Sequence, residues 1–218
     1  MAATVRLTDA LPVLGLGPFG TRVAHLLCDS IAGAYLIDPD DLEDAFGSRP
    51  AAVVVAAQHP APQVCRDADR AAWQHGVPWL PAVQEDAAVR IGPWVVPGEG
   101  PCFDCYVARR LQHDDQAGTT AAVWAAYAAD PGCGPTGFLP QHARAAAGTA
   151  HGLLDRPPVP GTVVALHTRS GNLDSQRVLR CHGCPRCAGE TVPGLDRTGD
   201  LAALLRPRNG TTPHGVPA

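Results

Sequence analysis

The sequence predicts an α/β protein with a Rossmann-like mixed sheet, whose parallel core grades into an antiparallel edge and whose two faces are covered by helices. Three observations predict this class. A glycine-rich turn lies inside a strand–helix–strand pattern, and a fully apolar run over 51–57 is typical of a buried parallel strand. Paired C-x-x-C turns indicate a four-cysteine zinc staple.

The first elements follow the order of a nucleotide-binding strand–helix–strand unit. An apolar run predicts a strand over 11–16, and apolar positions along one side predict a helix over 17–30. A β-type run predicts a second strand over 34–37, and the acidic run over 39–44 is expected to be a loop. The glycine-rich turn joins the first strand to the helix.

This turn has the spacing G-x-G-x-x-G, at Gly15, Gly17 and Gly20. In such units the first glycine permits a tight turn, the second lets the backbone approach a phosphate, and the third lets helix and strand pack closely. Asp38 is placed to accept hydrogen bonds from ribose hydroxyls. These residues form a candidate nucleotide site; the alternative is that the glycines only allow close packing.

The following segment continues the sheet. After the apolar strand, the pattern predicts a helix over 64–75 and a short strand over 77–81 between prolines. An antiparallel pair is expected at 88–91 and 94–96, on either side of a Gly-Pro turn. The parallel core therefore passes into an antiparallel edge.

The second half predicts three helices and a hairpin. The helices are expected over 102–111, 119–129 and 140–154, and the hairpin strands over 162–168 and 176–180. The second and third of these helices are rich in alanine, which offers faces for close packing.

Length and composition bound the organisation of the chain. Its 218 residues support one large domain with a tail. We expect a Rossmann-like zinc domain over 1–187 and a mobile C-terminal tail over 188–218, which is rich in Gly, Pro, Thr and Arg.

Charge and composition also exclude some function classes. The formal net charge is −4 and no basic block occurs, which argues against nucleic acid as a partner. No signal peptide or membrane-spanning run is recognisable, so a cytoplasmic protein without a membrane partner is expected. The chain has no lysine, which excludes any mechanism that needs a phosphate-binding lysine of its own.

The cysteine pattern predicts a metal site. Two C-x-x-C turns, each able to point two thiolates at one ion, supply the four ligands of a structural zinc: Cys102, Cys105, Cys184 and Cys187. A closed shell of four sulfurs leaves no open position, so no catalytic role is assigned to it. The alternatives are a redox dithiol, or substitution of one ligand by Cys181 or His182.

The order of these motifs resembles the ubiquitin-activating-type superfamily that includes ThiF and MoeB. Its D-x-D-x-V-E run corresponds to Asp38, Asp40 and Glu43, with Leu42 at the apolar position. Three further features are similar to the ThiF-like proteins of thiazole/oxazole-modified peptide biosynthesis. They are the stretch from Gly-Pro to the first C-x-x-C, the pair Arg109-Arg110 and the closing Cys-Pro-x-Cys. The resemblance covers about residues 11–187.

The resemblance implies an activity and partners. Active members adenylate a carboxylate with ATP and magnesium, and here the nucleotide would be held by Gly15, Gly17, Gly20, Asp38, Asp40 and Arg49. Members of the subfamily present a precursor (leader) peptide to a YcaO-type cyclodehydratase. The resemblance also implies a homodimer. Many members begin with a winged-helix leader-binding module, which is not expected here because the first strand begins near residue 11.

Departures from the family pattern weigh against adenylation. Only Arg49 is left in the segment that should carry an Arg-Gln pair, and the lysine for the triphosphate is missing. Gln58 stands where the magnesium-binding aspartate is expected, and an amide is a poor substitute on a hard cation. We therefore expect a non-adenylating scaffold that binds a precursor peptide, a cyclodehydratase, or both. The alternatives are an ATP-dependent enzyme that activates a peptide carboxylate and an NAD-type oxidoreductase.

Overall fold

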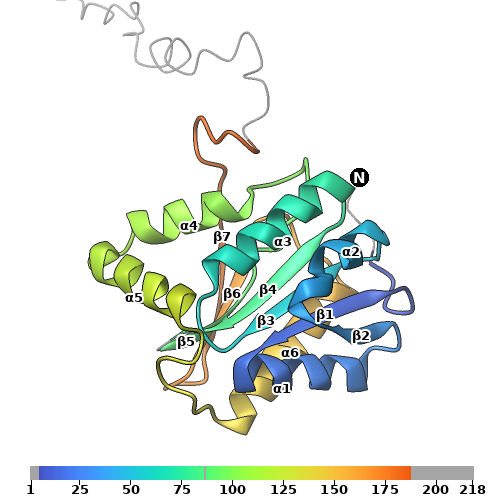
Figure 1. The fold of residues 1–218 in the computed structure, drawn as a ribbon, viewed down its shortest axis with the longest axis horizontal. Helices are drawn as coiled ribbons and strands as arrows, with labels where there is room; N and C mark the ends of the chain where they lie inside the picture. Colours follow the sequence, from blue (N-terminus) through green and yellow to red (C-terminus); the bar gives the residue numbers. More distant parts are fainter. Residues whose placement is uncertain (1–4, 86, 188–218) are drawn as a thin grey trace, which may run out of the picture.

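The computed structural model describes residues 5–85 and 87–187, which form a seven-stranded sheet with helices on both sides (Figure 1). The elements, in chain order, are β1 (Leu11–Leu16), α1 (Gly17–Ser30), β2 (Ala34–Ile37), the 3-10 turn η1 (Pro39–Asp41), α2 (Leu42–Gly47), β3 (Val53–Ala57), α3 (Pro62–His75), β4 (Trp79–Gln84), β5 (Ala88–Ile91), α4 (Phe103–Gln112), α5 (Ala117–Ala129), α6 (Pro140–Asp155), β6 (Thr162–His167) and β7 (Leu173–Arg177).

The sheet has a parallel half and an antiparallel half. Its strand order is β2-β1-β3-β4-β5-β6-β7. The first four of these strands pair in parallel, with Val13 opposite Leu36 on one side and Val54 on the other. From β4 onward every pairing is antiparallel. The predicted mixed sheet is therefore confirmed.

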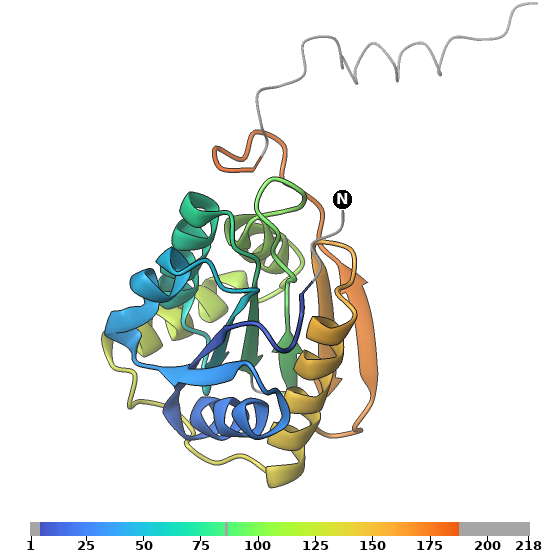
Figure 2. The ribbon, with the colours of Figure 1, turned by 90° about the vertical axis from the view of Figure 1, so that its right-hand side faces the viewer.

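Two apolar layers hold the helices against the two faces (Figure 2). On one face, α1 and α6 bury side chains such as Leu27 and Ala146 against Val13. On the other, α2, α3 and α4 bury Phe46 and its neighbours against Val55. Successive β-strand residues point to opposite faces, so each central strand contributes to both layers. Full burial of one such large apolar side chain stabilises the fold by about 1.5–3 kcal/mol.

Several predicted elements agree closely with the structure. The bounds of β1, α1 and β2 match the prediction, and β3 is buried at all five positions, as its apolar run indicates. The prediction of a loop over 39–44 was wrong, because this acidic run contains η1 and the first half of α2. Leu42, Ala45 and Phe46 have helical spacing, and their burial makes the segment helical despite its charge.

The antiparallel edge differs from the prediction in its partners. Residues 94–96 form no strand, and only Val95 bridges to Trp79. Instead β5 lies between β4 and β6, which comes from more than seventy residues later in the chain. The last strand, β7, begins at Leu173, directly after the turn, rather than near 176. All five residues of β7 are exposed, so no apolar alternation marked its start.

The predicted boundary between domain and tail coincides with the end of the described part of the chain. The expected mobile tail over 188–218 falls outside the described residues, and the division at 187 stays a prediction. Within the described ranges, no helix combines the length and apolar character that a membrane span requires.

Candidate metal centre and nucleotide site

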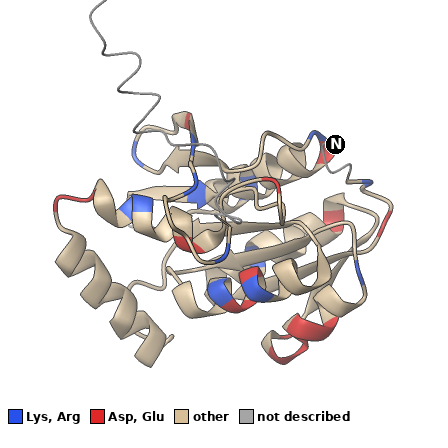
Figure 3. Cartoon of the chain, turned by 90° about the horizontal axis from the view of Figure 1, so that it is seen from above, with Lys and Arg blue, Asp and Glu red and all other residues tan. Residues whose placement is uncertain are grey.

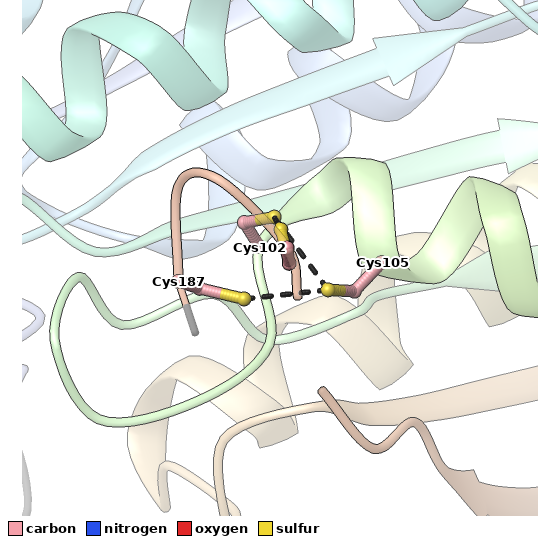
Figure 4. Close-up of side chains that lie close together, drawn as sticks. Cys102, Cys105 and Cys187 are labelled. Atoms are coloured by element: carbon pink, nitrogen blue, oxygen red, sulfur yellow. Dashed lines mark hydrogen bonds between the residues drawn. The ribbon is translucent and has the colours of Figure 1, made fainter. Parts of the chain in front are cut away.

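The four predicted cysteine ligands converge at one point (Figure 4). The first pair lies at the start of α4, and the second pair follows β7. Their sulfur atoms all lie within 4.8 Å of one another, and every one of the four residues is buried. The separation is 3.5 Å between Cys102 and Cys184 and 3.3 Å between Cys105 and Cys187. The sequence prediction that these residues share one site is confirmed in geometry.

The spacing of these sulfurs fits a tetrahedral ion. Four Zn–S bonds of ~2.3 Å in a tetrahedron separate neighbouring sulfurs by ~3.8 Å. The sulfurs of Cys102 and Cys105 are 3.8 Å apart, and the two separations given above are a few tenths of an ångström shorter. All eight cysteines lie in the described part of the chain and are free thiols, so no disulfide competes for this set. The donor set suits a soft or borderline cation such as zinc.

Ionisation of the cluster is uneven without an ion. Burial raises the pKa of Cys102, and it raises the pKa of Cys187 to about 12. Burial also opposes ionisation of Cys184, but hydrogen bonds from the backbone N–H groups of Cys187 and Arg186 lower its pKa to about 7. A metal ion would favour the thiolate form at all four positions.

A charged network connects the second C-x-x-C turn to the domain. Nη1 of Arg186, inside that turn, lies 3.2 Å from Oδ2 of Asp69 on α3, and its Nη2 lies 3.8 Å from Oδ2 of Asp104. The other oxygen of Asp69 accepts hydrogen bonds from the backbone N–H of Phe103 and the indole of Trp79. The side chain of Asp69 is only 1% exposed, so Arg186 brings the countercharge to a buried acid.

The two alternative ligands are not part of the set. The backbone N–H of Cys181 donates to the sulfur of Cys105, while the Cys181 thiol lies 3.8 Å from the backbone oxygen of Cys105. Cys181 therefore packs beside the centre. His182 is exposed and is absent from the described group of candidate ligands.

Packing within the chain accounts for the glycine-rich turn. A Cβ at Gly20 would collide with the backbone oxygen of Ala56 on β3, which confirms the need for close helix–strand packing. Gly17 has φ +69°, in the left-handed region, and a Cβ there would lie 2.7 Å from Cβ of Gln58. The group that approaches Gly17 is thus the Gln58 side chain.

Gln58 also occupies the hydrogen-bonding position where a phosphate would sit. It is 4% exposed, and its Oε1 accepts a hydrogen bond of 2.7 Å from the backbone N–H of Phe19, in the first turn of α1. Its own backbone N–H donates to the oxygen of Leu16, and its Nε2 donates to Pro135. Pro18 has no N–H to offer. The helix N-terminus is therefore partly satisfied from within the chain.

The structure separates the remaining predicted nucleotide residues. Asp38 and Asp40 follow β2 at the carboxyl ends of the parallel strands, on the same side as Gly17, and both are exposed. Arg49 lies at the opposite end of the sheet, because Ala51 two residues later hydrogen-bonds to Ala10, just before β1. The six residues of β1 span roughly 20 Å, so Arg49 is not brought to the glycine turn.

A large cavity opens beside this turn. It has a volume of about 560 Å³ and lies between the carboxyl ends of β3 and β4 and the inner side of α5. Gln58 borders it on one side, and Trp124 and Tyr127 of α5 border it on another. Ligands of open α/β sheets bind at this end of the strands, and the size is that of a small-molecule or peptide pocket.

An ion cluster closes the far wall of the cavity. Oε2 of Glu85 lies 2.7 Å from Nε of Arg90 and 3.1 Å from Nη2 of Arg110. Oδ2 of Asp114 lies 3.8 Å from Nη1 of Arg110 and accepts a hydrogen bond of 2.6 Å from Thr120. These residues come from β4–β5, α4 and α5, so the cluster joins three parts of the fold.

Solved structures of other proteins share this architecture. The heterocyclase TruD matches with a TM-score of 0.57 and 20% identity over 83% of this chain. A heterocyclase in complex with substrate and cofactor matches with a TM-score of 0.59 and 20% identity, and E. coli MccB with AMPCPP and MccA with 0.58 and 14%. The chain spans only 28% and 26% of the two heterocyclase chains and 67% of MccB. No protein-family profile and no curated protein sequence matches it.

The chain has a ThiF/MoeB-like fold. This confirms the fold relationship that the order of the motifs implied. At these identities the likeness establishes the ThiF/MoeB-like fold alone, so any activity has to be argued from the site.

Sequence reasoning missed the ion cluster of the cavity wall. Glu85 and Arg90 flank a turn between two short strands and form no motif. Arg110 belongs to an arginine pair on a predicted helix, and nothing in the sequence links it to Glu85. Their meeting depends on where β5 enters the ThiF/MoeB-like sheet, and that pairing was not predicted correctly.

Proposed function

We propose that this protein is a non-adenylating, zinc-stapled scaffold that binds a precursor peptide in the biosynthesis of a ribosomally made, azole-containing peptide. The observation that carries the proposal is the hydrogen bond from Phe19 to the buried Gln58 side chain. A phosphate bound at the start of α1 would have to displace this amide and break its contacts with two segments.

Charge supports the same conclusion. Nothing in the described glycine turn or at the end of β3 supplies a cation or a carboxylate for magnesium, since Gln58 follows the strand directly and Arg49 lies at the other end of the sheet. Adenylation needs stabilisation of developing phosphate charge, and the loss of one such donor costs roughly 3–4 kcal/mol.

Two observations support peptide binding: the cavity, and the ligands found in solved structures of the same fold. The cavity is open at the carboxyl end of the sheet and has both charged and aromatic walls. MccB has been solved with MccA, and a heterocyclase of the same fold with substrate. We propose a precursor peptide as the ligand and a YcaO-type cyclodehydratase as the partner enzyme, with the scaffold acting as a homodimer.

The four-cysteine centre serves this scaffold as a structural zinc site. Its ligands would tie α4 to the segment after β7, and zinc held by four thiolates would have no open position for chemistry. Free thiolates of this kind persist in a reducing compartment, which supports a cytoplasmic location.

Titration calorimetry with magnesium–ATP on the zinc-replete protein tests the proposal. We expect no saturable heat down to sub-millimolar affinity, and no ATP–pyrophosphate exchange in the presence of a candidate peptide. Light scattering after size exclusion measures the oligomeric state in the same preparation. Saturable binding that weakens in Asp38→Ala would overturn the non-adenylating assignment.

An ATP-dependent enzyme that activates a peptide carboxylate is the second candidate. The observation in its favour is the likeness to MccB, whose solved complexes include one with ATP. The same titration separates the two candidates, because the enzyme requires nucleotide binding and the scaffold does not.

A further inference from the structure

A second cleft lies on the far side of the ion cluster, between α4 and the end of the sheet. It has a volume of about 520 Å³, and its floor includes Arg90 and Val163. One side is formed by α4, from which Tyr106, Arg109, Arg110 and His113 line the cleft. These four residues have the spacing i, i+3, i+4, i+7, so a single face of the helix borders the cleft. Gln176 to Leu179 form the opposite side.

The lining of this cleft is basic. No acidic side chain occurs among its described lining residues, whereas four arginines do. Arg90 and Arg110 pair with Glu85, and Arg110 also pairs with Asp114; both acids line the neighbouring cavity instead. The guanidinium of Arg109 has no ion pair among the described residues and reaches only neutral oxygens, of Gln112 and Arg180.

Two guanidinium donors in the cleft are unused. The Nε atoms of Arg109 and Arg110 are shielded from solvent and have no hydrogen-bond partner. The fourth arginine, Arg177, is opposite Thr162 in the sheet, so strand alternation places its side chain on the other face from Gln176. The positive character of the cleft therefore rests mainly on Arg109, because Arg90 and Arg110 already pair with acids.

We propose that this cleft binds an acidic peptide segment, one of whose carboxylates pairs with Arg109. The inference rests on the proposed function only in that the ligand is a peptide. Planar guanidinium groups match carboxylates in geometry and bind them in bidentate fashion. Val163, Val178 and Leu179 add apolar groups to the lining of the cleft, and Leu179 is 61% exposed. A peptide with acidic and apolar residues fits such a lining better than an inorganic anion does.

Fluorescence anisotropy with a rhodamine-labelled hexaglutamate peptide tests this binding. We expect saturable binding that weakens as salt is raised, because exposed charges are screened. Arg109→Gln should weaken it about tenfold, the effect of losing roughly one hydrogen bond to a charged group. Arg109 is the residue of choice, since its removal leaves no buried acid without a partner.

The matched control is Arg22→Gln on α1, an exposed arginine on the opposite face of the sheet. It should bind hexaglutamate like the wild type, and both variants should keep the wild-type circular dichroism and Tm. A hexaglutamine peptide should not bind. Equal affinity of wild type and Arg109→Gln, or equal binding of the two peptides, would overturn the proposal. Stronger competition by tripolyphosphate than by unlabelled hexaglutamate would overturn the peptide assignment.

This result is independent of the nucleotide titration. If magnesium–ATP binds and hexaglutamate also binds at Arg109, the scaffold function fails while the acidic cleft stands. If neither binds, the non-adenylating assignment stands and the cleft proposal fails.

Discussion

Gly20 lies where α1 meets the backbone of β3, with no room for a side chain. Gly20→Ala should destabilise the protein by about 2–3 kcal/mol, since overpacking of a backbone contact forces the helix away from the sheet. Gly148 in α6 has open space around its Cβ position, and Gly148→Ala should stabilise the protein by about 0.5–1 kcal/mol. Urea denaturation measures both. Equal stabilities for the two variants would contradict this account of the glycine turn.

Asp114 anchors the start of α5. Hydrogen bonds from the Thr120 hydroxyl and from the backbone N–H of Gln116 lower the pKa of its carboxyl below the ordinary 3.8. An acid whose folded-state pKa is depressed contributes stability above its unfolded pKa, and that contribution is lost as pH falls through the folded pKa. Helicity should therefore fall below about pH 4 with a component that Asp114→Ala removes. Circular dichroism measures the loss of helicity as the pH falls. The control is Asp115→Ala, at the exposed neighbour of Asp114, which should lose helicity in acid as the wild type does.

Charge holds the second C-x-x-C turn to α3, and its sulfurs meet those at the start of α4. Burial raises the pKa of the Asp69 carboxyl, while the Phe103 N–H, Arg186 and Trp79 act in the opposite direction. Arg186→Gln should cost about 2–3 kcal/mol, because it leaves a buried carboxylate without its countercharge. The double variant with Asp69→Asn should recover part of this loss. Chemical denaturation of the wild type, the two single variants and the double variant gives the coupling energy between Arg186 and Asp69. Additive losses of stability would contradict an ion pair between these two side chains.

The candidate metal centre brings the start of α4 together with the segment after β7. We expect one zinc per chain by elemental mass spectrometry, and a fall in Tm of roughly 5 °C or more when a chelator removes it. Cys184→Ser should lose the metal. Cys133→Ser and Cys181→Ser, outside the four-sulfur group, should keep it. If Cys184→Ser kept the metal and Cys181→Ser lost it, Cys181 would be the fourth ligand in place of Cys184.

The elements show which features the sequence could predict. The strand–helix–strand unit at the start was correct to the residue, because its contacts are local and its apolar periodicity is strong. The two C-x-x-C turns met as predicted, since four thiols at this spacing have few other uses. The pairing of β5 with β6 was missed because more than seventy residues separate the two strands in the chain. Gln58 was noted for the carboxylate it replaces, but its bond to Phe19 required the fold to be known.

The molecule as a whole has a graded stability. All residues of β3 are buried in the centre of the sheet, whereas α5 has no buried residue and carries no charged side chain, as the uncoloured helix at the left of Figure 3 shows. Hydrogen exchange should be slowest in β1, β3 and β4 and fastest, among the described helices, in α5. Exchange followed by mass spectrometry checks this order. Protection of α5 equal to that of β3 would mean that another surface covers the helix in solution.

The two halves of the metal centre are 82 residues apart in the chain. A ribosome that adds ~5–20 residues per second makes the second pair of cysteines roughly 4–16 s after the first. Within that interval α5, α6 and both strands of the last hairpin are synthesised. The two thiols at the start of α4 therefore have no second pair of cysteines to meet until the last strands of the sheet have been made. Zinc captured by all four sulfurs therefore marks a chain whose antiparallel edge has been completed. Metal content per chain would serve as a direct measure of how much of a preparation has finished folding.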